Sequence, residues 1–180
     1  MDEQVAGDMA AGDMAAGEAT GEVAGDVAED VVVFTSVAQV QQRVGDELGP
    51  GEWFEVTQAR VDTFADATHD HQWIHCDPVR AASGPYGGTI AHGHLTASLL
   101  PFLLRSVFRV EGARLALNYG SDRVRFPAPL PVGSRIRARA VVVAVEPGAR
   151  GTQVVVRSTV EVEGSERPAL VATTRSLLVF

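Results

Sequence analysis

All five histidines of the chain lie in one short stretch, between positions 69 and 94. Asp70 and His75 stand out because they are five residues apart: a turning loop can bring both side chains to one cavity, whereas an undistorted helix would not. A carboxylate and an imidazole together can hold a water molecule, remove its proton and deliver a proton elsewhere, and each such transfer accelerates a reaction by ~10²–10⁴-fold. The spacing alone is a weak signal, because many proteins contain it by chance.

Two other interpretations of the histidine cluster have to be weighed. The pairs His69/His71 and His92/His94, with Cys76 nearby, resemble metal ligands. Zinc sites usually show recurring spacings such as H-E-x-x-H or paired C-x2-C, and neither is present, so we predict no bound metal. The histidines can also be ordinary loop residues, with Asp70 capping a turn, and this remains our interpretation of His69, His71 and His94.

The elements around the cluster follow from local patterns. Thr57 can cap a helix that places Val61, Phe64 and Ala65 on one face and ends near Thr68. Residues 69–92 lack apolar periodicity and contain several glycines, so we expect a long loop with a helical turn after Pro78. Asp70 and His75 therefore lie where a helix gives way to a loop.

The second half of the chain changes pattern twice. Residues 93–108 are apolar nearly all round and predict a buried helix, bent or weakened at Pro101. Alternating apolar and polar residues then predict strands over 114–126, 135–140, 154–163 and 169–180. A buried helix followed by antiparallel strands indicates an α+β domain.

Composition bounds the class of protein. A chain of 180 residues with 46% hydrophobic and 21% charged residues fits one soluble domain, without an apolar run long enough for a membrane helix. With no secretory signal and one cysteine, Cys76, we expect a cytoplasmic protein that does not bind membranes. The chain has no lysine, which excludes Schiff-base, pyridoxal-phosphate and Walker-type chemistry, and we expect no cofactor.

The net charge of −8 comes mainly from the N-terminus. Residues 1–30 hold nine acidic residues and no basic ones, and repeats of Ala-Gly-Asp-Met-Ala occupy part of residues 6–28. Such a segment cannot bury enough apolar surface to offset chain entropy, so we predict a disordered acidic tail over 1–32 and a folded domain over 33–180. The domain is close to neutral, which argues against nucleic-acid binding.

Several separated motifs resemble the MaoC-like, or R-specific enoyl-CoA hydratase, family. Residues 64–78 are similar to its motif Ser/Thr-Gly-Asp-x-Asn-Pro-aliphatic-His. The version Asp-His-Gln-Trp-Ile-His at 70–75, followed by Gly-Pro-Tyr-Gly-Gly-Thr-Ile-Ala-His-Gly at 84–93, is similar to the nodulation protein N branch. Residues 118–120 and 123–129 fit that branch too, so the resemblance covers roughly residues 34–180.

The resemblance implies a hot-dog fold, in which an antiparallel sheet wraps around a buried central helix, and usually a homodimer. It implies reversible hydration of trans-2-enoyl thioesters of coenzyme A or acyl carrier protein to (R)-3-hydroxyacyl thioesters. Asp70 and His75 match the catalytic pair that holds the water, and the sequence leaves open which is acid and which is base. Gly93 matches a glycine whose N–H polarises the thioester carbonyl.

The resemblance also assigns supporting positions. Ser98 matches a serine that orients the aspartate, His92 is expected to be structural, and Trp73 is expected to pack or to line an acyl pocket. His69 departs from the family, which has glycine there, so a left-handed backbone would have to be tolerated at some cost. A hot-dog acyl-CoA thioesterase and a non-catalytic acyl-thioester binding module remain the alternative functions.

Overall fold

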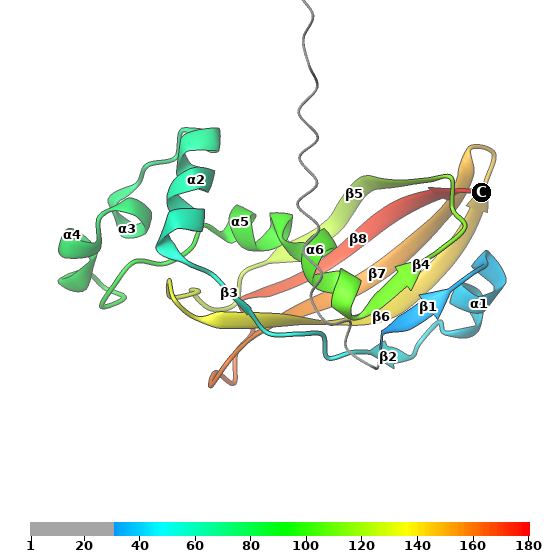
Figure 1. Cartoon of the computed structure of the whole chain (residues 1–180), viewed down its shortest axis with the longest axis horizontal. Coiled ribbons are helices and arrows are strands. Elements are labelled where there is room, and N and C mark those ends of the chain that lie inside the picture. The colour runs from blue at the N-terminus through cyan, green and yellow to red at the C-terminus, as the bar shows by residue number, and fades with distance from the viewer. Residues whose placement is uncertain (1–30) are drawn as a thin grey trace, which may run out of the picture.

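The described chain, residues 31–180 of a computed structural model, opens with a strand that packs beside a later one (Figure 1). Strand β1 (Val32–Phe34) pairs in parallel with β4 (Phe108–Val110), and helix α1 (Val37–Gln42) follows with Ser36 as its cap. Most of the tail predicted over 1–32 lies outside the described residues, which begin at residue 31. Its last position, Val32, is the first residue of β1. The parallel pair was not predicted.

One antiparallel sheet forms the body of the domain. Its strand order is β2-β6-β7-β8-β5, and β3 also pairs with β6. The strands span β2 Glu47–Leu48, β3 Phe54–Glu55, β5 Leu115–Arg125, β6 Arg135–Gly148, β7 Gly151–Val162 and β8 Leu170–Val179. Val154, Val156 and Val160 are buried, while Arg157 on the same strand is exposed, so the alternation read from the sequence is confirmed. The α+β prediction holds.

The predicted central helix lies across one face of the sheet but is divided (Figure 1). It consists of α5 (Gly93–Ser98), α6 (Leu100–Leu103) and a 3-10 turn over Leu104–Ser106. Pro101 has no N–H to donate to the preceding turn, which explains the interruption just before it. The expected continuation to Phe108 was wrong, because that residue begins β4.

The central segment is buried on one side only. Leu95, Leu99, Leu100 and Leu103 belong to the hydrophobic core. Phe102 lies on the uncovered side and is exposed, so the prediction of burial nearly all round was too strong for the single chain. A sheet from one chain covers one face of a helix, which leaves the opposite face open.

Three helices form a separate cluster at one end of the sheet (Figure 1). They are α2 (Gln58–Thr68), α3 (Trp73–Cys76) and α4 (Pro78–Ala82). Helix α2 is capped by Thr57 as predicted, and α4 begins at Pro78, but α3 was expected to be loop. No helix within residues 31–180 is long and apolar enough to cross a membrane.

Candidate active site

Asp70 follows the end of α2 through a left-handed residue. His69 has φ of 58°, and its N–H donates to the carbonyl of Ala65. The N–H of Asp70 donates to the same carbonyl at 3.2 Å. The expected departure from the family is thus real: His69 adopts a backbone conformation that favours glycine, at a cost of about 1 kcal/mol. It turns the chain sharply and places Asp70 beyond the helix end.

The carboxylate of Asp70 is open to solvent. Its side chain is 59% exposed. Within residues 31–180 it accepts no hydrogen bond, and Nε2 of His92 lies 3.9 Å from its Oδ2. The position of this carboxylate therefore depends on the main chain that carries it.

His75 is buried, and its ring is held by a hydrogen bond to the main chain of Ile90. It is 7% exposed, and its Nδ1 lies 2.6 Å from the carbonyl oxygen of Ile90. A carbonyl can only accept, so Nδ1 carries the hydrogen and Nε2 is the nitrogen left to exchange a proton. Burial lowers the pKa of His75 below its ordinary value of 6.5, and His92 acts in the same direction, against the hydrogen bond to Ile90 and the charge of Asp70.

Gln58 fixes the main chain of His75, and this role was not foreseen from the sequence. Its amide donates to the carbonyl of His75 at 2.7 Å and accepts from the hydroxyl of Thr89 at 2.7 Å. These bonds join α2, α3 and the segment before α5. A glutamine at the start of a helix carries no motif, so nothing in the sequence could have identified it.

His92 joins the predicted pair. Its ring is 4% exposed and stacks on His75, with centroids 3.8 Å apart and planes inclined by 28°. Its Nε2 lies 2.8 Å from the carbonyl oxygen of Asp70, and Phe64 packs against the ring with centroids 5.2 Å apart. Its Nδ1 is buried without a hydrogen-bond partner among the described residues.

The three side chains also form a possible ligand set for a metal. Ligand atoms of Asp70, His75 and His92 lie within 4.8 Å of one another. Imidazole lone pairs lie in the ring plane, so the lone pairs of these two stacked rings lie in separate planes inclined by only 28°, an arrangement that does not favour convergence on one ion. In addition, the Asp70 carbonyl and the Ile90 carbonyl each occupy one ring nitrogen. This geometry suits proton transfer better than metal binding, and the expectation of no metal stays a prediction.

Gly93 follows His92 and opens α5. Its N–H makes no hydrogen bond within residues 31–180, as expected for the first residue of a helix. A Cβ built at Gly93 would lie 3.0 Å from the ring of Phe126, closer than such atoms normally approach. Glycine at this position therefore lets Phe126 pack against the backbone beside the free N–H.

The other predicted positions lie apart from this group. Ser98 is exposed near the end of α5 and makes no hydrogen bond to Asp70. Trp73 packs under the guanidinium of Arg80, 4.5 Å from the ring centroid, and against Gly84, so a packing role is evident and the acyl-pocket role stays a prediction. His71 pairs with Asp66 at 2.8 Å on the surface.

Cys76 ends α3, next to His75, but its chemistry is passive. Burial raises the pKa of its thiol, and the carboxylates of Asp62, Asp66 and Asp70 act in the same direction. A thiol that stays protonated is a poor nucleophile and a poor metal ligand. The reactive groups of this site are therefore the carboxylate and the imidazole.

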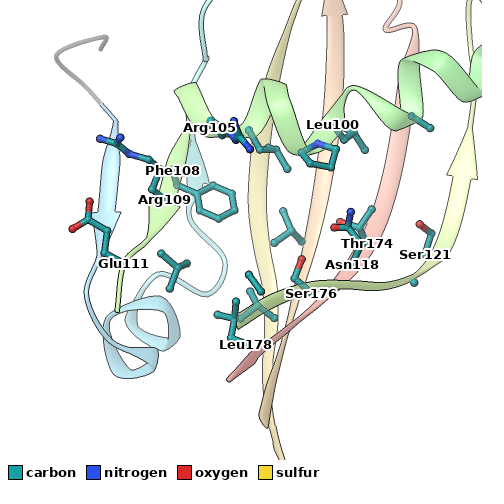
Figure 2. Close-up of a pocket in the computed structure, with 18 residues that line it drawn as sticks. Leu100, Arg105, Phe108, Arg109, Glu111, Asn118, Ser121, Thr174, Ser176 and Leu178 are labelled. Carbon is teal, nitrogen blue, oxygen red and sulfur yellow. The ribbon is translucent and has the colours of Figure 1, made fainter. Parts of the chain in front are cut away.

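A cavity of about 580 Å³ lies between the central helical segment and the sheet (Figure 2). Apolar side chains line its helical wall, among them Ala97, Leu100 and Leu104, and Phe108 of β4 lies beside them. Strands β5 and β8 supply Asn118, Ser121, Thr174 and Ser176 on the facing wall. Ala97 is four residues beyond Gly93, so the cavity begins about one helical turn from the free N–H.

Known proteins are similar to this chain in sequence and in fold. The chain is 55% identical over 140 residues to 3-hydroxyacyl-thioester dehydratase Z of Mycobacterium tuberculosis, covering 77% of this chain and 93% of the relative. It is 47% identical over 150 residues to nodulation protein N of Rhizobium leguminosarum bv. viciae, covering 81% and 92%. The unliganded R-hydratase PhaJ1 of Pseudomonas aeruginosa superimposes with a TM-score of 0.61 at 19% identity, covering 76% of this chain and 81% of that one.

The family model of the MaoC like domain matches residues 39–164. This range contains α2, α3, α5 and most of the sheet, and thus Asp70, His75, His92 and Gly93, whereas β8 lies beyond it. The similarity to a solved R-hydratase confirms the hot-dog fold expected from the sequence. The chain belongs to the MaoC-like dehydratase family.

Proposed function

We propose that this protein is a 3-hydroxyacyl-thioester dehydratase, a hydro-lyase that interconverts (R)-3-hydroxyacyl and trans-2-enoyl thioesters. The observation that carries the proposal is the grouping of Asp70 and His75 beside His92. His92 is followed in the chain by Gly93, whose N–H is unused within the described residues. The names of similar proteins, a 3-hydroxyacyl-thioester dehydratase and an R-hydratase, point to the same chemistry.

His75 is suited to accept the proton of the water. Its Nδ1–H is committed to Ile90, and burial lowers its pKa, so Nε2 is an unprotonated acceptor at neutral pH. In the hydration direction, Asp70 and His75 hold one water, whose oxygen bonds to C3 as its proton passes to the pair. The pair then returns one proton to C2, so the water is fully consumed and the enzyme is unchanged.

Between these two events the thioester carbonyl gains negative charge. The unused N–H of Gly93 can donate to that oxygen, because it has no partner within the described chain. A donor fixed in place before the reaction stabilises the enolate without reorganisation. This supports the assignment of Gly93 as the group that polarises the carbonyl.

The acyl chain fits the cavity under the central segment. The apolar wall near Ala97 and Leu100 begins about one turn from Gly93, so a thioester bound at Gly93 can extend its chain into the cavity. Burial of apolar chain there contributes about 0.8 kcal/mol for each CH₂ group.

A second copy of the chain is the partner we propose. Within residues 31–180, strand β5 pairs only with β8, so its other edge is open in that part of the chain, and Leu115, Leu117 and Tyr119 on it are exposed. An open apolar edge favours pairing with another strand, and two copies of β5 can pair antiparallel about a two-fold axis. Such a dimer also shields the uncovered side of the central segment.

Sedimentation equilibrium tests the dimer. We expect twice the chain mass of 19.0 kDa, and a shift to a single chain in Leu117→Lys. Val79→Lys, at an exposed position on α4, is the control and should leave the mass unchanged. A wild-type mass of one chain at micromolar concentration would contradict this assembly.

The function itself is tested with crotonyl-CoA. We expect the absorbance of the conjugated enoyl thioester to fall on adding the protein, with (R)-3-hydroxybutyryl-CoA as the product on chiral analysis. Release of a free thiol, detected by a thiol reagent, would instead indicate a thioesterase. Binding of enoyl thioesters of several chain lengths without turnover would indicate a binding module.

A further inference from the structure

The carboxylate of Asp70 has no side chain that orients it in the way expected of Ser98. Ser98 is exposed at the far end of α5 and donates no hydrogen bond to Asp70. The structure instead gives Asp70 two main-chain anchors, its N–H to Ala65 and its carbonyl to Nε2 of His92. Since the carboxylate accepts no hydrogen bond from any described residue, these anchors determine where it lies.

His92 makes the anchor that reaches across the site. The carbonyl of Asp70 can only accept, so Nε2 of His92 carries the hydrogen and donates at 2.8 Å. The two residues are 22 positions apart, so this bond holds the turn after α2 against the start of α5. The same nitrogen is 3.9 Å from Oδ2 of the Asp70 carboxylate.

The ring of His92 also determines the orientation of His75. One side of the His92 ring stacks on His75, with centroids 3.8 Å apart, and Phe64 packs at 5.2 Å. The next residue along the chain is Gly93, whose N–H is free. One buried imidazole is thus linked to the main chain of Asp70, the ring of His75 and the backbone donor.

We propose that His92, and not Ser98, is the positioning residue of the Asp70–His75 pair. It acts through the hydrogen bond to the Asp70 carbonyl and through the stack on His75, and it does not touch the reacting atoms. The inference rests on the proposed dehydratase function for its kinetic test. A second test uses the protein without substrate, so failure of the two can be told apart.

Two substitutions separate the two contacts of His92. His92→Phe keeps a flat ring against His75 and loses the hydrogen bond, whereas His92→Gln keeps an amide N–H at about the position of Nε2 and loses the ring. His71 is the matched control, because it is exposed and pairs only with Asp66. His71→Phe and His71→Gln are made in parallel, together with Ser98→Ala.

We expect His92→Phe to lower kcat by about 10²-fold, the loss expected from a misplacement of roughly 1 Å, with KM changed by less than about threefold. His92→Gln should recover at least about tenfold of that loss, because it restores the donor to Asp70. The His71 variants should behave as wild type. Wild-type kinetics in His92→Phe, or a larger loss in Ser98→Ala than in His92→Phe, would overturn the proposal.

The substrate-free test is an NMR titration of the His75 ring. The charged and titratable groups that face His75 are Asp70, from the turn after α2, and His92, at the start of α5. Since His92 helps to keep the pKa of His75 low, both His92 variants should titrate His75 at higher pH than wild type does. An unchanged titration in both variants would overturn the proposal even if the protein proves inert on enoyl thioesters. A titration that shifts in an inert protein would leave the positioning role standing and reject the function.

Discussion

The imidazole rings of His75 and His92 lie face to face, with centroids 3.8 Å apart. His75 also donates from Nδ1 to the carbonyl of Ile90. The stack therefore restrains the face of the ring, and the hydrogen bond restrains rotation within the ring plane. A ring held in this way can direct only Nε2 toward a bound water. The predictions below test the consequences of this fixed arrangement.

The pH dependence of activity should follow His75. Because burial lowers its pKa below the ordinary 6.5, the neutral form that accepts the water's proton persists into mildly acidic solution. We expect kcat/KM for hydration to be level near pH 7 and to fall below pH 6.5, as His75 becomes protonated. The same lowered pKa favours the folded state above pH 6.5, and that contribution is lost as pH falls through the pKa of folded His75. An acidic limb centred above pH 7 would contradict the assignment.

His69→Gly should stabilise the protein. Glycine adopts the left-handed conformation of position 69 without the cost of about 1–2 kcal/mol that a side chain incurs. The greater freedom of glycine in the unfolded chain offsets part of this gain, by about 0.4–1 kcal/mol. We expect the free energy of unfolding in urea to rise by up to about 1 kcal/mol.

His71→Gly provides the control for this substitution, because His71 has no positive φ. There glycine adds unfolded-state freedom and also removes the surface pair with Asp66, so the free energy of unfolding should fall. A loss of stability in His69→Gly equal to that of the control would show that the left-handed turn carries no strain.

Gly93→Ala should damage catalysis more than folding. The new Cβ would approach the Phe126 ring to 3.0 Å, and Phe126 is partly exposed, so it can move aside at a modest cost in stability. That movement disturbs the space beside the Gly93 N–H, where the carbonyl oxygen is expected. The N–H itself is kept, so we expect kcat to fall by about 10²-fold, the loss that follows a misplacement of roughly 1 Å. Gly88→Ala, where a Cβ meets nothing within 4 Å, is the control, and equal losses in both variants would reject the role of Gly93.

Ala97→Phe should change the preference for chain length. Ala97 lines the cavity close to Gly93, and a phenyl group there would fill the start of the apolar space. We expect kcat/KM for a C12 enoyl thioester to fall at least tenfold more than that for crotonyl-CoA. Ala59→Phe on the exposed side of α2 should leave the ratio unchanged. Equal losses for short and long substrates in Ala97→Phe would place the acyl chain elsewhere.

Local patterns were enough to predict the four long strands β5 to β8 and the Thr57 cap. The pair of Asp70 and His75 was singled out by the family resemblance, because its spacing alone is a weak signal. The short, uncapped helix α3 was missed, because four residues give no periodic signal long enough to detect. The break in the central helix lies at the weak point that Pro101 predicted. The roles of Gln58 and His92 depend on bonds between residues 17 and 22 positions apart. Such contacts exist only once the turn after α2 meets the start of α5, so no spacing in the sequence announces them.

The central claim is that Asp70 and His75 act on one water as a unit. Its most direct test is a double-mutant cycle on kcat/KM for crotonyl-CoA hydration, with Asp70→Asn, His75→Gln and the double variant, after each has been shown to be folded. Residues that act as a unit are strongly non-additive. We expect each single variant to lose at least about 10³-fold and the double variant to lose little more than the worse single one. Losses that multiply in the double variant, or a single variant that retains wild-type activity, would contradict the account.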